Sequence, residues 1–130
     1  MRYLLDTTVL IDHAHDRAGV AELLDDLFGQ PNDLYTCDVI VAEALSKGPD
    51  DEALVIGSLI RALEYVSTHP DAARWAGESR RQRRAHGPRS LSDAIIAGVA
   101  RSLDAVVVTR NPRDFESQGV PVLTYGQTAA

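Results

Sequence analysis

The chain has 130 residues, 45% of them hydrophobic, and a formal net charge of −6. This length suits one domain, 1–130, that buries a core without disulfides, and the single cysteine fits a reducing compartment. No apolar stretch approaches the roughly 18 residues that span a bilayer, and the N terminus lacks the layout of a signal peptide, so we expect a soluble, cytoplasmic protein without a membrane segment.

The first predicted element is a buried strand at residues 1–5, and it leads directly into Asp6. In open α/β sheets ligands collect outside the carboxyl ends of the strands, so this position points toward a site. A helix is predicted next, at residues 9–15. Asp6 or Thr7 could simply cap that helix, and the local sequence favours neither role for Asp6.

A helix at 17–28, a loop at 29–33 and a strand at 34–36 are expected next, followed by a helix at 38–46 that Asp38 caps. Glu43 falls on the same apolar face of that helix as Val39 and Ile40. A glutamate that points inward is costly unless it is paired, hydrogen-bonded or bound to a cation. The pattern therefore favours a functional role for Glu43.

A helix at 51–63, a brief strand at 65–66 and a helix at 70–85 follow. Six of the thirteen Lys and Arg residues lie between positions 74 and 89, opposed there only by Glu78. This local basic patch in an acidic protein could bind phosphates, be a solvated helix face or dock an acidic partner segment. Its arginines are Arg74, Arg80, Arg81, Arg83, Arg84 and Arg89.

Ser90 marks the start of another predicted helix, in which Asp93 shares a stripe with Ile96, Ala97 and Ala100. An acid in the first turn also complements the helix dipole. That role explains the residue type but not its inward direction, so Asp93 is a second candidate site acid.

The unbroken apolar run at 106–108 predicts a strand covered on both faces. Pro112 then starts a turn or short helix that contains Asp114, and Asn111 or Asp114 could reach back across the strand ends. A last strand is expected at 122–123. Strands that alternate with helices predict a three-layer α/β fold, with a short, mainly parallel sheet flanked by helices.

Convergence is the simplest explanation for Asp6, Glu43, Asp93 and Asp114. Several carboxylates a few ångströms apart raise each other's pKa, so keeping them ionised requires a divalent cation. Oxygen ligands favour Mg²⁺ or Mn²⁺. The lone cysteine and the scattered histidines offer no spaced set of zinc ligands; these residues are Cys37, His13, His15, His69 and His86.

The chain resembles PIN-domain ribonucleases, in particular the compact VapC-type toxins of bacterial toxin–antitoxin pairs. The resemblance runs nearly end to end in order, spacing and length. It is carried by four segments: YLLDTTVLID at 3–12, VIVAE at 39–43, LSDAIIA at 91–97 and VTRNPRDF at 108–115.

The resemblance implies that Asp6, Glu43 and Asp93 bind the metal and that Thr7 supports the site by hydrogen bonding. The fourth polar position is Asn111 or Asp114, because family members often carry Asp where this chain has Asn111. The implied activity is metal-assisted hydrolysis of RNA phosphodiester bonds, with Arg80, Arg81, Arg83, Arg84 and Arg89 as candidate RNA contacts.

The resemblance also implies a homodimer and a small antitoxin that blocks the site. A groove for an amphipathic antitoxin helix could lie between two apolar stripes, although core packing explains most of the same residues. The stripes are Val20, Leu23, Leu24, Leu27 and Phe28, and Leu54, Ile56, Leu59, Ile60 and Leu63.

Two alternatives remain open. A phosphotransferase with an aspartyl nucleophile at Asp6 would need a second Asp where this chain has Thr8, and Lys47 is no good candidate for its lysine. A non-catalytic PIN-like module that binds RNA or protein is the stronger alternative, although such a module has no reason to keep a cluster of inward-facing acids.

Overall fold

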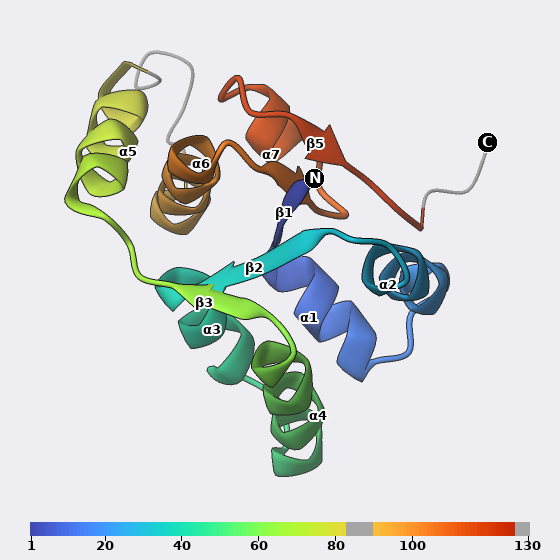
Figure 1. The fold of residues 1–130 in the computed structure, drawn as a ribbon. Coiled ribbons are helices and arrows are strands. Elements are labelled where there is room, and N and C mark those ends of the chain that lie inside the picture. The colour runs from blue at the N-terminus through green and yellow to red at the C-terminus, as the bar shows by residue number, and fades with distance from the viewer. Residues whose placement is uncertain (83–89, 127–130) are drawn as a thin grey trace.

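A five-stranded sheet lies at the centre of the computed structural model, which describes residues 1–82 and 90–126 (Figure 1). The strands follow the order β3-β2-β1-β4-β5, and every neighbouring pair is parallel. The predicted α/β fold is confirmed, and the sheet is parallel throughout the described strands. The strands are β1 (Arg2–Leu5), β2 (Asp33–Cys37), β3 (Glu64–Val66), β4 (Val106–Val108) and β5 (Val122–Leu123).

Helices cover both faces of this sheet. Figure 1 shows α1, α3 and α4 on one side of the strands and α5, α6 and α7 on the other. This arrangement gives the three layers that the sequence predicts. The helices are α1 (Thr7–Ala14), α2 (Val20–Phe28), α3 (Asp38–Leu45), α4 (Asp50–Arg61), α5 (Pro70–Gln82), α6 (Leu91–Leu103) and α7 (Arg113–Glu116).

The core is centred on β1, which pairs with β2 on one side and β4 on the other. Leu4 and Leu5 of β1 stand in register with Val107 and Val108 of β4, and all four side chains are fully buried. Continuous apolar runs of this kind belong to strands covered on both faces. Because all strands run the same way, their carboxyl ends open at one edge of the sheet.

Two helices begin two or three residues away from the predicted start, for identifiable reasons. Helix α1 begins at Thr7 rather than at residue 9, because Asp6 has extended backbone angles and stands at the N-cap position. Helix α2 begins at Val20 rather than at residue 17, because Gly19 has a φ of 91°, in the left-handed region that a right-handed helix cannot include.

The predicted cap of α3 is wrong. Cys37 stands at the N-cap position, and Asp38 lies inside the first turn. The carboxylate of Asp38 instead accepts hydrogen bonds from the hydroxyl of Tyr65 and the backbone N–H of Thr68, and these bonds lower its pKa. Asp38 therefore ties α3 to the end of β3.

Three further residues contribute to the packing of the core. Phe115 anchors α7 in the core and is fully buried, as is Cys37. Trp75 packs against the core from α5 while Arg101 of α6 lies over its ring, 5.5 Å from the centroid. None of the described helices is both long and apolar enough to cross a membrane.

Helices α5 and α6 approach each other closely at Gly98. A Cβ atom at this position would lie 2.6 Å from the backbone oxygen of Ala72, closer than real contacts allow. Gly98 therefore permits the backbone of α6 to approach α5, and it fixes the distance between the helix that carries the arginines and the helix that carries Asp93.

We expect Gly98→Ala to lower the free energy of unfolding by about 1 to 3 kcal/mol, because the added methyl group forces the two backbones apart. Gly77→Ala on α5 is the matched control, since nothing lies within 4 Å of its Cβ position. It should stabilise the helix by about 0.5 to 1 kcal/mol. Urea unfolding measures both values, and equal effects would contradict the close-approach argument.

Candidate active site

Asp6 is held at the carboxyl end of the central strand. Its side chain is 4% exposed and does not cap α1. Instead, Oδ2 accepts hydrogen bonds from the hydroxyl of Thr109 at 2.8 Å and from that of Thr8 at 3.3 Å. Burial raises the pKa of Asp6, while these hydroxyls and the backbone N–H of Thr7 lower it. The carboxylate is thus oriented by groups from both β1–α1 and the turn after β4.

Glu43 approaches Asp6 from α3. Its side chain is half-buried, and Oε1 accepts a hydrogen bond of 2.9 Å from the hydroxyl of Thr7. The charge of Glu43 contributes to the raised pKa of Asp6. Thr7 and Asp6 are neighbours in the chain, so this bond places the first two candidate acids side by side.

Asp93 enters the same region from the first turn of α6. Ser90 caps that helix, since its hydroxyl accepts a hydrogen bond from the backbone N–H of Asp93. Burial raises the pKa of Asp93 to about 7, with further contributions from the charges of Asp114, Asp6 and Glu43, in that order. The other three predicted acids therefore all act on this side chain, although the four come from separate parts of the chain.

Asp114 and Asn111 lie on α7 and on the turn before it, and both are exposed. Asp114 has the largest electrostatic effect on Asp93 among the acids. Asn111 instead meets the site through its backbone, because its N–H donates to the hydroxyl of Thr109 at 3.0 Å. Gln118 ties these parts together, since its side-chain amide donates to the backbone oxygens of Asp114 and Asp93.

Asp6, Glu43, Asp93 and Asp114 together form what we call the acid cluster. Its donors are all oxygen atoms, which suits Mg²⁺ or Mn²⁺ better than zinc. Within residues 1–82 and 90–126, however, no three Asp, Glu, His or Cys side chains stand close enough to hold an ion as a ready-made group. Carboxylates of like charge repel one another, and a cation between them would remove that repulsion. The donor set fits a divalent ion, but its side chains would have to draw together around it.

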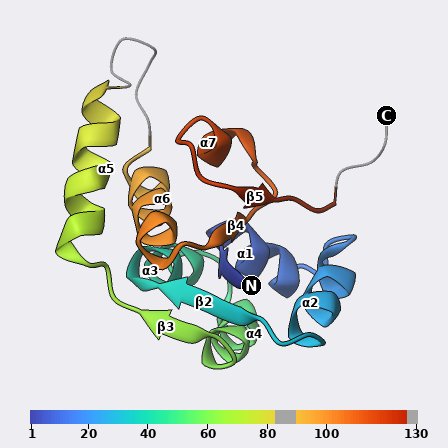
Figure 2. The same ribbon diagram turned by 45° about the horizontal axis from the view of Figure 1, so that its top comes forward.

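The basic patch is described only in part. Arg74, Arg80 and Arg81 lie on α5, where Arg74 pairs with Asp71 and Arg81 with Glu78. In Figure 2, the last turn of α5 and the first turn of α6 lie at the same end of the helix pair. The basic end of α5 is therefore on the side of Asp93. The predicted contacts Arg83, Arg84 and Arg89 lie outside the described residues.

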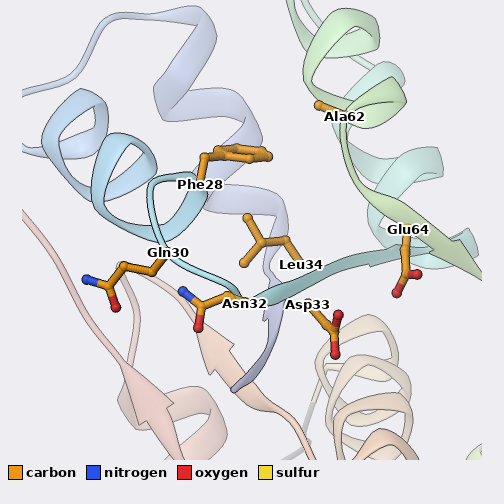
Figure 3. A pocket seen from close by; sticks show the side chains of 7 residues that line it. All are labelled: Phe28, Gln30, Asn32, Asp33, Leu34, Ala62 and Glu64. Carbon is orange, nitrogen blue, oxygen red and sulfur yellow. The ribbon is translucent and has the colours of Figure 1, made fainter.

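A separate pocket lies near the opposite edge of the sheet (Figure 3). Asp33 and Glu64, which begin β2 and β3, line it. None of the predicted site residues does. The pocket is therefore not part of the acid cluster. Its other lining residues are Phe28, Gln30, Asn32, Leu34 and Ala62.

Sequence reasoning did not assign a role to Thr8 or Thr109, although both hydroxyls bind Asp6. Their common signal is a hydroxyl residue that follows a buried parallel strand closely. It also gave no role to Asp12, which is 2% exposed and pairs with Arg110. The sequence does carry a signal for Asp12, which is an acid placed among the apolar residues of α1.

Two relatives of known name, both VapC proteins, match most of this chain. "Ribonuclease VapC19" of Mycobacterium tuberculosis is 28% identical over 113 residues, which are 86% of this chain and 90% of that protein. The "tRNA(fMet)-specific endonuclease VapC" of Shigella flexneri is 29% identical over 126 residues, 92% of this chain and 93% of that protein.

Solved structures show the same fold. The structure of VapBC2 from Rickettsia felis, bound to a DNA fragment from its promoter, matches with a TM-score of 0.82 at 19% identity. The match covers 96% of this chain and 99% of that one. A family model described as PIN domain matches residues 3–120. On that match, and in agreement with the sequence-based resemblance, the chain belongs to the PIN domain family.

Proposed function

We propose that the chain is a metal-dependent endoribonuclease, one PIN domain over residues 1–130, that acts as the toxin of a toxin–antitoxin pair and inhibits translation. The observation that carries the proposal is the raised pKa of Asp93, about 7, which burial causes first and to which the charges of Asp114, Asp6 and Glu43 all contribute. The relatives named ribonuclease and endonuclease support RNA as the substrate.

In this proposal Asp6, Glu43, Asp93 and Asp114 are the catalytic acids and would hold Mg²⁺ or Mn²⁺. The charge of Asp114 acts on Asp93, which supports Asp114 as the fourth ligand, and Asn111 is the other candidate for that position. When bound, such an ion lowers the pKa of water and stabilises charge at phosphorus, so the chain needs no nucleophile of its own.

The remaining roles belong to residues that orient these acids. The hydroxyl of Thr7 holds Glu43, and the hydroxyls of Thr8 and Thr109 hold Asp6. Asn111 supports the turn through its backbone hydrogen bond to Thr109. Of the four acids, Asp6 and Glu43 are thus oriented by hydroxyl groups before an ion binds, which lowers the cost of ordering them.

The basic end of α5 is proposed as a phosphate contact, with Arg80 and Arg81 among the described residues and Arg83, Arg84 and Arg89 beyond them. Its position beside the first turn of α6 would place the RNA backbone near Asp93. Cations supply most of the affinity for phosphates, so a local patch can serve a protein whose net charge is −6.

A cytoplasmic location, a homodimer and a small antitoxin partner complete the proposal. The VapBC complex that shares this fold supports the antitoxin. Of the two apolar stripes expected to form its groove, Phe28 is 45% exposed and Leu54 is 73% exposed. Most of the other members pack in the core, so these two side chains are the ones available to a partner helix.

A non-catalytic binding module remains the second candidate. The observation in its favour is that the described acids do not form a ready-made ligand group. Titration calorimetry with Mn²⁺ separates the two functions, because a pure binding module has no use for a cation at Asp6 and Asp93.

We expect the purified chain to cut total bacterial RNA at discrete positions with Mg²⁺ or Mn²⁺ and not with EDTA. Asp93→Asn should lower cleavage at least about 100-fold while the fold is kept, because it removes a ligand charge but little volume. Glu116→Gln on α7 is the matched control, an exposed acid near Asp114, and should cut like the wild type. Cleavage by Asp93→Asn at the wild-type rate would refute the site.

The metal-free protein should become less stable as pH rises from about 4 to about 7. The pKa of Asp93 is raised from 3.8 to about 7 in the folded state, so folding favours the protonated carboxyl. The stabilisation that this carboxyl gives the folded state is complete below 3.8, its pKa in the unfolded chain. It is lost as the pH rises through about 7, its pKa in the folded state. Thermal unfolding in EDTA should show this loss in the wild type and in Glu116→Gln.

Asp93→Asn should flatten that part of the profile, because its amide carries no charge at any pH. Mn²⁺ at pH 8 should restore stability to the wild type more than to Asp93→Asn, since the ion binds the folded state. An identical pH profile for the variant and the wild type would show that Asp93 is not the group responsible.

Replacing Arg80 and Arg81 together with Gln should weaken RNA binding, measured by fluorescence anisotropy in the Asp93→Asn background so that the RNA stays intact. The slope of log affinity against log salt should fall by about 0.7 for each phosphate that the variant no longer neutralises. Arg61→Gln on α4 is the control for removal of a surface arginine. An unchanged slope in the double variant would exclude α5 as the RNA-binding helix.

A further inference from the structure

Asp12 is a buried carboxylate for which the proposed chemistry has no use. It lies in α1, almost two turns beyond Asp6, and is 2% exposed. Its Oδ2 accepts a hydrogen bond of 2.8 Å from Nε of Arg110 and one of 2.7 Å from the hydroxyl of Tyr125. Burial and the bond to Asp12 raise the pKa of Tyr125, which keeps its hydroxyl a donor.

This network joins three distant parts of the chain: α1, the turn after β4 and the segment after β5. An ion pair with one buried partner is weak support for stability, because taking the charge of Asp12 out of water costs about as much as its attraction to Arg110 returns. Its more specific effect is to join the turn after β4 to α1. Arg110 is the member of the network whose position bears on the acid cluster.

Arg110 stands between the residues that orient Asp6. Its backbone N–H donates to the hydroxyl of Thr8 at 3.2 Å, and Thr8 in turn donates to Oδ2 of Asp6. The residue before it, Thr109, donates to the same oxygen of Asp6. The backbone of Arg110 is therefore hydrogen-bonded to one of these hydroxyls and directly follows the residue that carries the other.

The side chain of Arg110 attaches that backbone to α1, in addition to its place directly after β4. Its side chain is 33% exposed, while its partner Asp12 is buried, so the pair attaches a surface turn to the interior. Tyr125 is 7% exposed, and its hydroxyl is the second donor to Asp12. The turn is thus attached to α1 by the Thr8 bond close to Asp6 and by the Asp12 bond farther along the helix.

We propose that Arg110 is a positioning residue for the acid cluster: its ion pair with Asp12, completed by Tyr125, holds the turn so that Thr8 and Thr109 fix the carboxylate of Asp6 for cation binding. This inference rests on the proposed metal-dependent function. It assigns Arg110 no contact with RNA or with the ion.

The test is the affinity of the chain for Mn²⁺ without RNA, measured by electron paramagnetic resonance of free Mn²⁺. Arg110→Met keeps much of the length of the side chain and removes its charge and donors. We expect its Mn²⁺ affinity to fall about 10- to 100-fold, the usual effect of removing a group that orients a metal ligand. Arg113→Met, an exposed arginine on α7, is the matched control and should bind like the wild type.

Arg110→Met leaves Asp12 buried with one partner fewer, so the single variant could unfold. The double variant Asp12→Asn with Arg110→Met removes both charges and should fold, as judged by circular dichroism and thermal unfolding. It still lacks the anchor, so its Mn²⁺ affinity should remain weakened by the same factor. A network that served stability alone would give this folded variant the wild-type affinity.

Tyr125→Phe completes the series, because it removes one hydroxyl and leaves the ion pair. Its affinity should lie between those of the wild type and Arg110→Met. Folded Arg110 variants that bind Mn²⁺ as tightly as the wild type would overturn the positioning role and leave the proposed function intact. A wild type that binds no Mn²⁺ would overturn both.

Discussion

The parallel pairing of β1 with β4 is the constraint on which the rest of the structure depends. It sets Leu5 against Val108, and the backbone N–H of Asp6 continues the ladder by donating to the oxygen of Val108 at 2.9 Å. Thr109 follows Val108 directly, so its hydroxyl reaches Asp6. A slip of one residue would turn these side chains to the other face of the sheet and separate the acid from its donor.

Charge and burial oppose each other in the acid cluster. Asp6 lies in the interior, and Asp93 is half-buried among three other carboxylates. Desolvation and repulsion both favour protonation, while the hydroxyls around Asp6 favour the charged form. A site of this kind is least stable when it is ionised and empty, and a divalent cation reverses that penalty. In the proposed function, binding of a divalent cation would therefore stabilise the folded state.

The acids come from elements that are packed against one another. Glu43 and Asp93 lie on α3 and α6, which contact each other, and α6 is packed closely against α5 through Gly98. Asp114 lies on a short helix that Phe115 anchors in the core and that Gln118 ties to the backbone of Asp93. If the proposed ion binds, only the side chains would have to adjust around it, because the helices that carry them are already packed against one another.

The sequence by itself determined the alternation of strands and helices and the acids at their ends, because apolar runs and turn residues are local signals. It misplaced the starts of α1 and α2 by two and three residues and named the wrong cap for α3, since backbone angles at Asp6, Gly19 and Cys37 decide these boundaries. Only the tertiary structure decided the partners of Asp6 and Asp12. Thr109 and Arg110 lie 103 and 98 residues from them along the chain, and no local pattern encodes which distant side chains the sheet brings together.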